Sequence, residues 1–177
     1  MRIDLFYFLA FVSLPILSEL SIEVDISEQR LYILNDRMIT KSYPISSSYF
    51  GEGQVENSYK TPLGKHIIQE MIGTNVEKNT IFVNRIQNNQ IASIIHEKLD
   101  TENDYITSRI MWLSGVEDGF NNGTSVDSYD RYIYIHGTQE EGLIGSKASH
   151  GCIRMFNHDV IELYNLVKKG TKVNIRL

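Results

Sequence analysis

The sequence has one cysteine among 177 residues, so it cannot form an internal disulfide. It has three prolines, and no Pro-rich or Gly/Ser-rich linker divides it into domains. A net charge of −5, without a block of like charges, argues against a general nucleic-acid-binding protein, which normally presents a basic face. What remains is a globular composition, 42% hydrophobic and 22% charged, on a length that suits one domain.

Long hydrophobic runs are scarce too, with one exception at the N-terminus. Residues 5–17 read LFYFLAFVSLPIL, and Arg2 supplies a positive charge before them. A run of this length fits the core of a signal peptide better than a membrane span, which needs roughly 20 residues. Asp4 and the lack of an A-x-A cleavage site are untypical of such a peptide, so a buried N-terminal element is the alternative. We expect residues 1–20 to be a signal peptide or membrane anchor that directs export to the periplasm or cell wall.

The rest of the chain alternates as a mainly β protein does. Stretches rich in β-branched and aromatic residues predict strands at 21–27, 30–34, 37–43, 66–72, 80–84, 105–113, 131–137 and 172–176. Asn35-Asp36 predicts a hairpin turn, because both residues tolerate positive φ. Residues 91–99 fit a helix and a strand equally well. The expected fold is therefore a β-sandwich or mixed sheet with one or two helices.

One helix is predicted late in the chain. Asn157 is expected to cap it, and Asp159 stands in its first turn, where a carboxylate suits the helix dipole. A basic last turn and a closing glycine complete the pattern: Lys168, Lys169 and Gly170. Residues 46–64 and 114–130 form long turn-rich segments, which in compact domains usually carry function.

The single cysteine lies in the stretch SHGCIRM, between a histidine and an arginine that are each two residues away. A free cysteine is often only a small buried hydrophobe, so its neighbours must decide its role. In the upstream stretch RYIYIHG the isoleucines point one way and His136 the other, so His136 is expected to emerge at the end of this strand, beside Gly137. The loop that follows is long enough to return Cys152 beside the same strand end.

These residue types suit nucleophilic chemistry. An ordinary thiol has a pKa of about 8.5, and a nearby imidazole such as that of His136 can take the proton of Cys152. Arg154 adds a charge that cannot be titrated away. Gly151 lets a substrate approach the backbone, and the N–H groups of residues 151 and 152 are candidates for an oxyanion hole.

Each feature also has a structural alternative. A histidine on a strand is often a satisfied structural residue, and Arg154 could pair with a carboxylate. A zinc site built from His136, His150 and Cys152 is conceivable, but no C-x-x-C or H-x-x-x-H spacing supports it. The remaining histidines are expected to be structural or surface residues: His66, His96 and His158.

The stretches IHGT and IGSKASHGCIRMFNHDVIELYNLVKKGTKVNI closely resemble the signature of the L,D-transpeptidase catalytic domain, the YkuD family. The resemblance extends upstream to YPIS (43–46) and KTPLGKHII (60–68), and covers about residues 22–176. So many fixed residues at fixed spacing make a specific match. It implies a mainly β catalytic domain over residues 21–177. The segment QEEG (139–142) replaces a proline-containing spacer common in the family, and no peptidoglycan-binding repeat accompanies the domain.

The resemblance assigns roles to individual residues. It implies Cys152 as the nucleophile on a loop in a cleft and His136 as the base that activates it. It implies that the carbonyl of Gly137 orients this histidine. The rest of the motif would shape the cleft, with Arg154 a contact for a substrate carboxylate: Ser149, His150, Gly151 and Arg154. His150 is kept as a second candidate for the base, since residues two apart on one strand share a face.

The implied reaction is acyl transfer on peptidoglycan stem peptides without a metal or organic cofactor. The cysteine would release the terminal D-alanine of a tetrapeptide stem, and an amine would resolve the thioester to give a 3-3 cross-link. The amine could belong to a second stem, a lipoprotein lysine or a free D-amino acid. Water as acceptor would make the protein an L,D-carboxypeptidase. A non-catalytic peptidoglycan-binding module is the alternative of another class. No nucleic-acid partner is expected, and membrane contact is expected only through the N-terminal segment.

Overall fold

The computed structural model describes residues 19–177, so the predicted leader lies almost wholly outside the described residues. Within them the chain forms one mixed sheet of ten strands in the order β3-β2-β1-β10-β4-β7-β5-β6, with β8 paired to β7 and β9 to β8. No helix in the described part is long and apolar enough to cross a membrane. The strands are β1 (Leu20–Asp25), β2 (Arg30–Asn35), β3 (Met38–Pro44), β4 (Gly64–Ile72), β5 (Thr80–Val83), β6 (Ile86–Ile91), β7 (Ile106–Gly115), β8 (Tyr134–Thr138), β9 (Ile153–Met155) and β10 (Lys172–Arg176).

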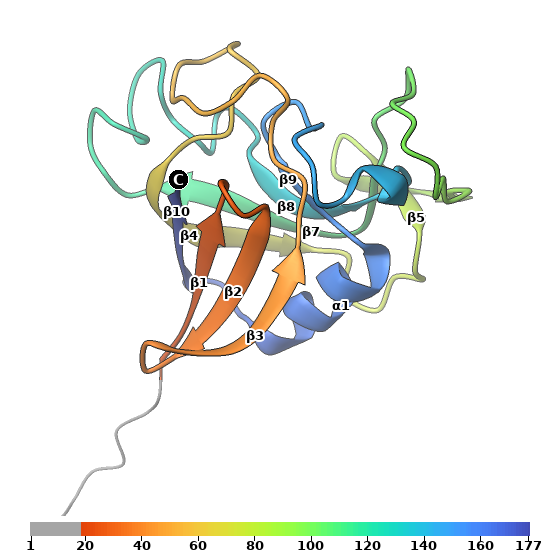
Figure 1. Ribbon diagram of the computed structural model, residues 1–177, viewed down its shortest axis with the longest axis horizontal. Coiled ribbons are helices and arrows are strands. Elements are labelled where there is room, and N and C mark those ends of the chain that lie inside the picture. Colours follow the sequence, from red (N-terminus) through yellow and green to blue (C-terminus); the bar gives the residue numbers. More distant parts are fainter. Residues whose placement is uncertain (1–18) are drawn as a thin grey trace, which may run out of the picture.

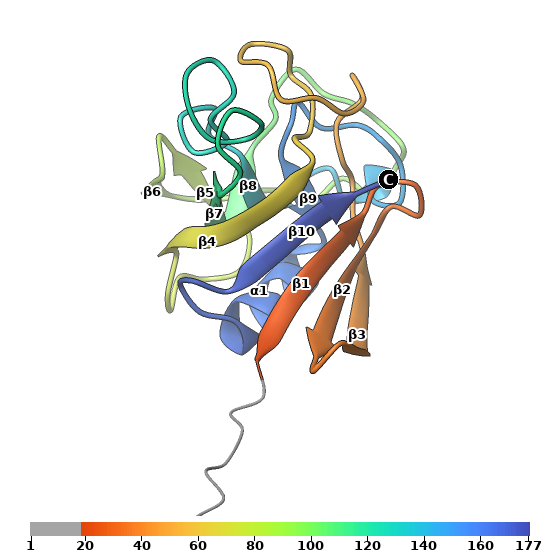
Figure 2. The same cartoon turned by 90° about the vertical axis from the view of Figure 1, so that its left-hand side faces the viewer.

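A single α-helix among the described residues, α1 (Asn157–Leu166), packs against β7 and β8 on one face of the curved sheet (Figures 1 and 2). Its inward side chains Val160 and Leu163 join a core of branched aliphatic residues that includes Ile135 and Ile153. A second, aromatic cluster lies around Trp112 and is built with Phe82, Ile110 and Tyr134. The sheet is thus covered by the helix over its main core and by aromatic side chains near β5.

The predicted fold class is confirmed, and several elements match closely. The last strand covers the predicted residues 172–176. Ile133 and Ile135 enter the main core, whereas Tyr134 belongs to the aromatic cluster, so the predicted alternation of this stretch is correct. The strand itself begins at residue 134, because Tyr132 has a φ of +57° that interrupts the extended backbone before it.

Three predictions in the first half of the chain need correction. The β2–β3 turn is centred on Asp36 and Arg37, whose φ angles are +49° and +69°, one residue later than predicted. Residues 92–99 form neither a helix nor a strand, and Ile91 alone belongs to β6. Strand β6 was not predicted, because its sequence QNNQ is almost entirely exposed and has no apolar alternation.

The prediction that Asn157 caps the helix is wrong. The N-cap is Phe156, and Asn157 is the first helical residue. Its buried side chain accepts hydrogen bonds from Thr107 and Ser108, both at 2.6 Å, and donates to the carbonyl of Thr138 at 2.7 Å. The amide therefore joins three elements, a gain that a local cap could not match.

The predicted end of the helix is also wrong. The helix ends at Leu166, and Val167 is already extended, so Lys168 and Lys169 follow the helix instead of filling its last turn. Gly170 has a φ of +84° and donates its N–H to the carbonyl of Ile68 in β4. It turns the chain into β10 and does not close the helix.

Candidate active site

Parallel pairing of β8 with β9 brings the two halves of the sequence motif together. Ile135 pairs with Ile153 and His136 with Arg154. Cys152 is the residue immediately before β9, so it lies beside the beginning of β8. The chain therefore returns to the strand that carries His136, as its sequence spacing predicts.

The sulfur of Cys152 is held by the backbone of the incoming strand. Sγ donates to the carbonyl of Tyr132 at 3.4 Å and accepts the N–H of Tyr134 at 3.3 Å. The residue is half-buried and packs against the aromatic cluster around Trp112. The thiol is thus fixed at the edge of the sheet, partly open to solvent.

His136 is buried, with 2% of its surface exposed, and lies two residues before the end of β8. The prediction that it emerges at the strand end is therefore wrong. Its Nδ1 lies 2.7 Å from the carbonyl oxygen of Gly137, the contact that the resemblance implied. A Cβ on Gly137 would come within 2.6 Å of the Asn157 side chain, so only glycine fits there. Burial lowers the pKa of His136 to about 4, although Asp104 acts in the opposite direction.

Cys152 has the opposite tendency. Removal from solvent raises the pKa of its thiol to about 12, and Asp104 raises it further, while the Tyr134 N–H, Arg154 and Arg131 lower it. The positive charges around the loop lower the pKa of the thiol less than burial raises it. Burial therefore favours the neutral forms of both the thiol and the imidazole.

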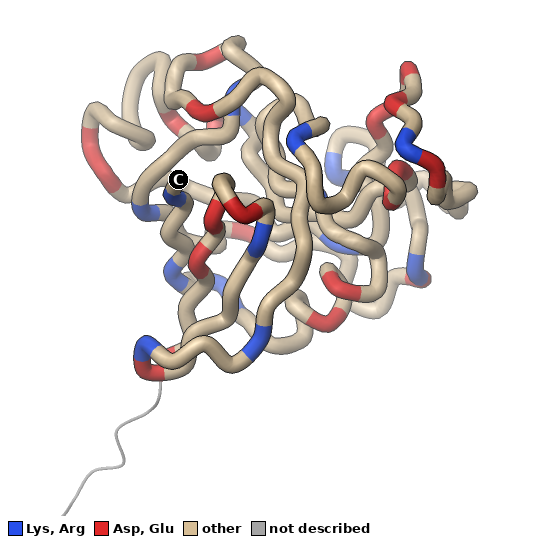
Figure 3. The backbone as a smooth tube through the Cα atoms, viewed as in Figure 1, with Lys and Arg blue, Asp and Glu red and all other residues tan. Residues whose placement is uncertain are grey.

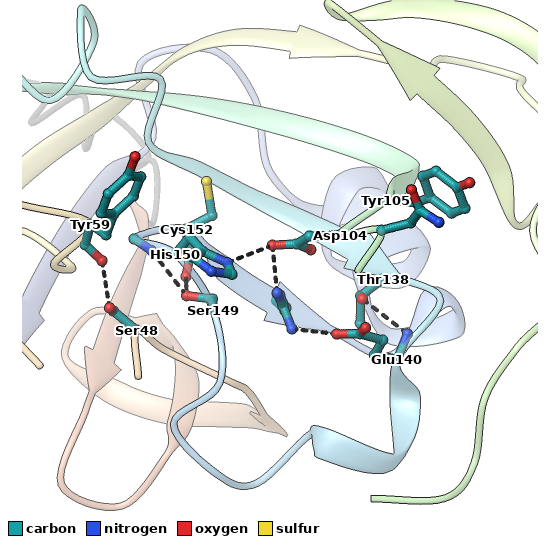
Figure 4. A network of polar contacts seen from close by, with 12 residues as sticks. Ser48, Tyr59, Asp104, Tyr105, Thr138, Glu140, Ser149, His150 and Cys152 are labelled. Atoms are coloured by element: carbon teal, nitrogen blue, oxygen red, sulfur yellow. Dashed lines mark hydrogen bonds and ion pairs between the residues drawn. The ribbon is translucent and has the colours of Figure 1, made fainter. Parts of the chain in front are cut away.

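The residues before the cysteine form a tight turn (Figure 4). Ser149 donates its hydroxyl to the carbonyl of Cys152 at 2.5 Å and accepts the N–H of Gly151 at 3.3 Å. Gly151 has a φ of +121°, in the region that favours glycine. His150 is exposed, and its Nδ1 lies 3.2 Å from Asp104. Because β9 begins only at residue 153, His150 and Cys152 do not share a strand as expected.

Arg154 is fully buried and doubly paired. Its Nη2 lies 2.5 Å from Asp104 Oδ2 and its Nη1 lies 2.9 Å from Glu140 Oε2 (Figure 4). Glu140 is fully buried as well and accepts the N–H and hydroxyl of Thr101. The structural alternative stated for this arginine, pairing with a carboxylate, is thus observed. Sequence reasoning missed Asp104, because it lies far from the motif in an irregular segment with no distinguishing pattern.

A hollow of about 250 Å³ lies beside the cysteine loop, lined among others by Tyr59, Arg131, Tyr132 and His150. Two larger hollows, of about 530 and 430 Å³, are lined by other parts of the sheet and the end of the helix and do not include Cys152. In residues 19–177 no group of three or more His, Cys, Asp or Glu side chains is arranged to hold a metal ion. The half-buried thiol therefore lies in a loop that is flanked by one small hollow, lined by His150 of that loop and by Tyr132.

The sequence matches a known protein family. A family model described as the L,D-transpeptidase catalytic domain matches residues 19–175. The putative L,D-transpeptidase YkuD of Bacillus subtilis strain 168 is 56% identical over 41 residues, which are 23% of this chain and 25% of that protein. The probable L,D-transpeptidase YcfS of Escherichia coli K12 is 42% identical over 48 residues, which are 27% of this chain and 15% of that protein. The aligned segments span a quarter or less of these two relatives.

Solved structures share the fold. An L,D-transpeptidase from Mycobacterium smegmatis superimposes with a TM-score of 0.57 at 16% identity, over 90% of this chain and 59% of that one. L,D-transpeptidase 3 from Mycobacterium tuberculosis, solved with a faropenem-derived adduct, gives a TM-score of 0.55 at 16% identity, over 90% of this chain and 61% of that one. This chain spans about three fifths of each of these neighbours.

Proposed function

The chain belongs to the L,D-transpeptidase catalytic-domain family, and from that premise we propose that it transfers acyl groups between peptidoglycan stem peptides through a thioester on Cys152. The donor is a tetrapeptide stem whose terminal D-alanine is released, and the product is a 3-3 cross-link. The reaction takes place in the periplasm or cell wall, where this substrate lies. Peptidoglycan is thus the partner, and no cofactor takes part in the steps below.

The main observation behind the proposal is the position of the sulfur, which is held by two backbone hydrogen bonds. Sγ lies between the carbonyl of Tyr132 and the N–H of Tyr134, on the strand that carries His136 two residues further on. Cys152 also packs against the aromatic cluster that contains Tyr134. Tyr134 and His136 alternate on one face of β8, with ring centroids 6.5 Å apart, so the thiol packs against the face of the strand that carries the imidazole. A half-buried thiol with an imidazole on its own side of the sheet suits nucleophilic catalysis.

The hydrogen bond of His136 supports its proposed role as the base. Its Nδ1 lies 2.7 Å from a carbonyl oxygen, which can only accept, so Nδ1 carries the proton and Nε2 carries a lone pair. Nε2 is therefore the atom that takes the proton of the thiol. Because the pKa of His136 is lowered to about 4 and that of Cys152 raised to about 12, the proton moves as the sulfur attacks and not beforehand.

The reaction has two stages, formation of the thioester and its resolution by an amine. Sγ bonds to the carbonyl carbon before the terminal D-alanine while His136 takes the thiol proton. The same proton passes to the leaving nitrogen as the C–N bond breaks, which releases D-alanine and leaves the thioester. An acceptor amine attacks this thioester, the C–S bond breaks, and the surplus proton returns through His136 to the sulfur. The Cys152 N–H is a donor for the oxyanion, while that of Gly151 is shared with Ser149.

Purified tetrapeptide stems test the proposal. The wild-type chain is expected to release D-alanine and form the cross-linked dimer, and Cys152→Ala is expected to form neither, because no other thiol is present. Equal product formation by both proteins would contradict the proposal. A metal chelator should leave the wild-type rate unchanged, since the thiol and imidazole supply the chemistry.

Two other readings make different predictions in the same assay. An L,D-carboxypeptidase would use the same residues and give tripeptide alone, because water resolves the thioester. A non-catalytic peptidoglycan-binding module would bind stems without releasing D-alanine. A lipoprotein lysine is a further acceptor of the transferase reaction, and it would appear as a mass increase on that protein.

A further inference from the structure

Arg131 and Arg154 both lie near Cys152, but Arg131 is held by backbone carbonyls. Its Nη1 donates to the carbonyls of Gly53 and Gln54 at 3.2 and 2.8 Å, and its Nη2 donates to that of Lys60 at 2.6 Å. Carbonyls fix the guanidinium without cancelling its charge. No carboxylate of the described residues lies within ion-pair distance of it, in contrast to Arg154.

The guanidinium still has donors to offer. Arginine carries five N–H groups, and three are used by the carbonyls, which leaves Nε–H and one Nη2–H without a partner among residues 19–177. Nε and Nη2 lie on one edge of the guanidinium plane. Two donors on one edge match the two oxygens of a carboxylate.

Arg131 lines the hollow of about 250 Å³ described above, and its charge acts on the Cys152 thiol. Tyr132 lines it too, and the carbonyl of Tyr132 accepts the hydrogen bond from Sγ at 3.4 Å. The carbonyl of Lys60 that Arg131 holds would lie 3.4 Å from a Cβ at Gly151. The guanidinium and the thiol are therefore linked through contacts that involve the residues next to the cysteine.

Two carboxylates line the same hollow. Glu56 belongs to the segment 46–64 and Asp130 to the segment 114–130, and both are exposed and make no ion pair within the described residues. These two segments lie on the same side of the molecule, and Figure 3 shows acidic residues along them. The hollow thus presents one fixed positive group and two negative groups at its mouth.

This charge pattern fits a ligand that carries both signs on neighbouring atoms. A simple carboxylate would be repelled by Glu56 and Asp130, and a simple amine would leave the donors of Arg131 unused. An α-amino acid head satisfies both, because its carboxylate and ammonium share one carbon. We infer that the hollow binds the head of the acyl acceptor as a zwitterion, with the carboxylate on Arg131 and the ammonium beside Glu56 and Asp130.

The inference rests on the proposed function and names the acceptor class that it uses. A free D-amino acid has such a head, and so does the side-chain end of diaminopimelate in a second stem. After binding, the ammonium loses one proton to solvent. Its lone pair then attacks the thioester on Cys152, the new amide bond forms and the C–S bond breaks. Stems lacking this head would resolve the thioester poorly, and water would take over.

The inference is tested with the full chain by measuring how much of the thioester is transferred to an amine acceptor and how much is hydrolysed. The tetrapeptide donor is supplied with D-methionine, with D-methioninamide, which lacks the carboxylate, or with a second stem with or without an amidated side-chain carboxylate. We expect D-methionine to be transferred about tenfold more efficiently than its amide, the effect of one charge-assisted bidentate contact. Measurable and equal transfer to the two compounds would overturn the inference, as would equal transfer to the stem with and without an amidated side-chain carboxylate. Loss of transfer on amidation of the stem supports it even if D-methionine itself is a poor acceptor.

Arg131 also holds the backbone of residues 53–60, so variants must separate its binding of the acceptor carboxylate from its structural role. Arg131→Gln should remove the preference for the carboxylate, measured as the ratio of transfer to D-methionine and to its amide, which does not depend on the rate of thioester formation. Arg37→Gln on the distant β2–β3 turn should keep the preference. If Arg131→Gln also prevents thioester formation, the double variant Glu56→Gln, Asp130→Asn decides, since both positions are exposed. That variant should raise the KM for amine acceptors a few-fold, and an unchanged KM would overturn the inference. If wild type forms no thioester at all, the proposed function fails before the acceptor site is tested.

Discussion

Two arginines flank the cysteine loop and meet opposite environments. Arg154 is fully buried and its charge is cancelled by Asp104 and Glu140, whereas Arg131 is half-buried and held by carbonyls alone. The buried charge can ion-pair within the protein but has no surface for a ligand. The half-buried charge remains available at a hollow. Sequence alone would favour Arg154 as the ligand-binding group, because it lies in the motif. The burial of Arg154 favours Arg131 instead.

Removal of the sulfur between the two arginines should have the largest effect. Cys152→Ala is expected to lower the rate of D-alanine release by about a thousandfold or more, because loss of a nucleophile removes the covalent path. The rate is measured with tetrapeptide stems by chromatography. His158→Gln is the control, since the His158 imidazole is exposed on α1 and contacts Asp159 and the ring of Phe156. A similar loss in the control would mean that the loss does not depend on the thiol.

The next test compares the arginines as stabilising groups. Arg154→Met should lower the free energy of unfolding by about 3–5 kcal/mol, because it leaves the buried carboxylate of Glu140 without its charged partner. Arg131→Gln should cost only about 1–2 kcal/mol, since water can replace the hydrogen bonds of a half-buried group. Urea unfolding followed by circular dichroism measures both. A larger cost at Arg131 would reverse the assignment of structural and ligand-binding roles.

A third prediction concerns the pH dependence of stability that the buried His136 contributes. The pKa of His136 falls from 6.5 to about 4 on folding, so the unfolded chain binds more protons between these values. Stability should therefore be lost as the pH falls from about 6.5 to 4, by up to about 3 kcal/mol from this residue. His136→Gln should make the dependence of the free energy of unfolding on pH less steep in this range. Equal slopes in wild type and variant would show that the imidazole of His136 is not desolvated.

The smallest effect should appear in the reactivity of the thiol. Asp104 raises the pKa of Cys152 and Arg131 lowers it. Asp104→Asn is therefore expected to speed alkylation by iodoacetamide at pH 8 a few-fold, and Arg131→Gln to slow it, because only the thiolate reacts. Rates come from intact mass against time. Changes of the same sign in both variants would contradict the electrostatic picture of the loop.

The parts of the molecule that sequence could predict are those with a local signal. Alternation located the strand at 172–176 and the two faces of the Ile133–Ile135 stretch, and the motif spacing predicted the return of Cys152 to that strand. Polar β6 escaped, because an exposed edge strand carries no apolar period. Asn157 was misread as a cap, since its hydrogen bonds run to Thr107 and Ser108 about fifty residues away.

In the candidate site too, sequence alone located some residues but not the partners that set their environment. The motif residues were found by spacing, but the partners that decide their environment are remote in sequence. Asp104 reaches His150 and Arg154 from an irregular segment, and Arg131 is held by the carbonyl of Lys60. Whether a charge is cancelled or left open depends on such tertiary contacts, and no local pattern records them.

Intact-mass spectrometry of the protein after incubation with a tetrapeptide donor tests the central claim most directly. The account predicts that wild type gains the mass of the donor minus D-alanine, that peptide mapping locates the addition on Cys152, and that an amine acceptor removes it. Turnover of the stem without any adduct on the cysteine, or an adduct that persists unchanged in Cys152→Ala, would contradict it.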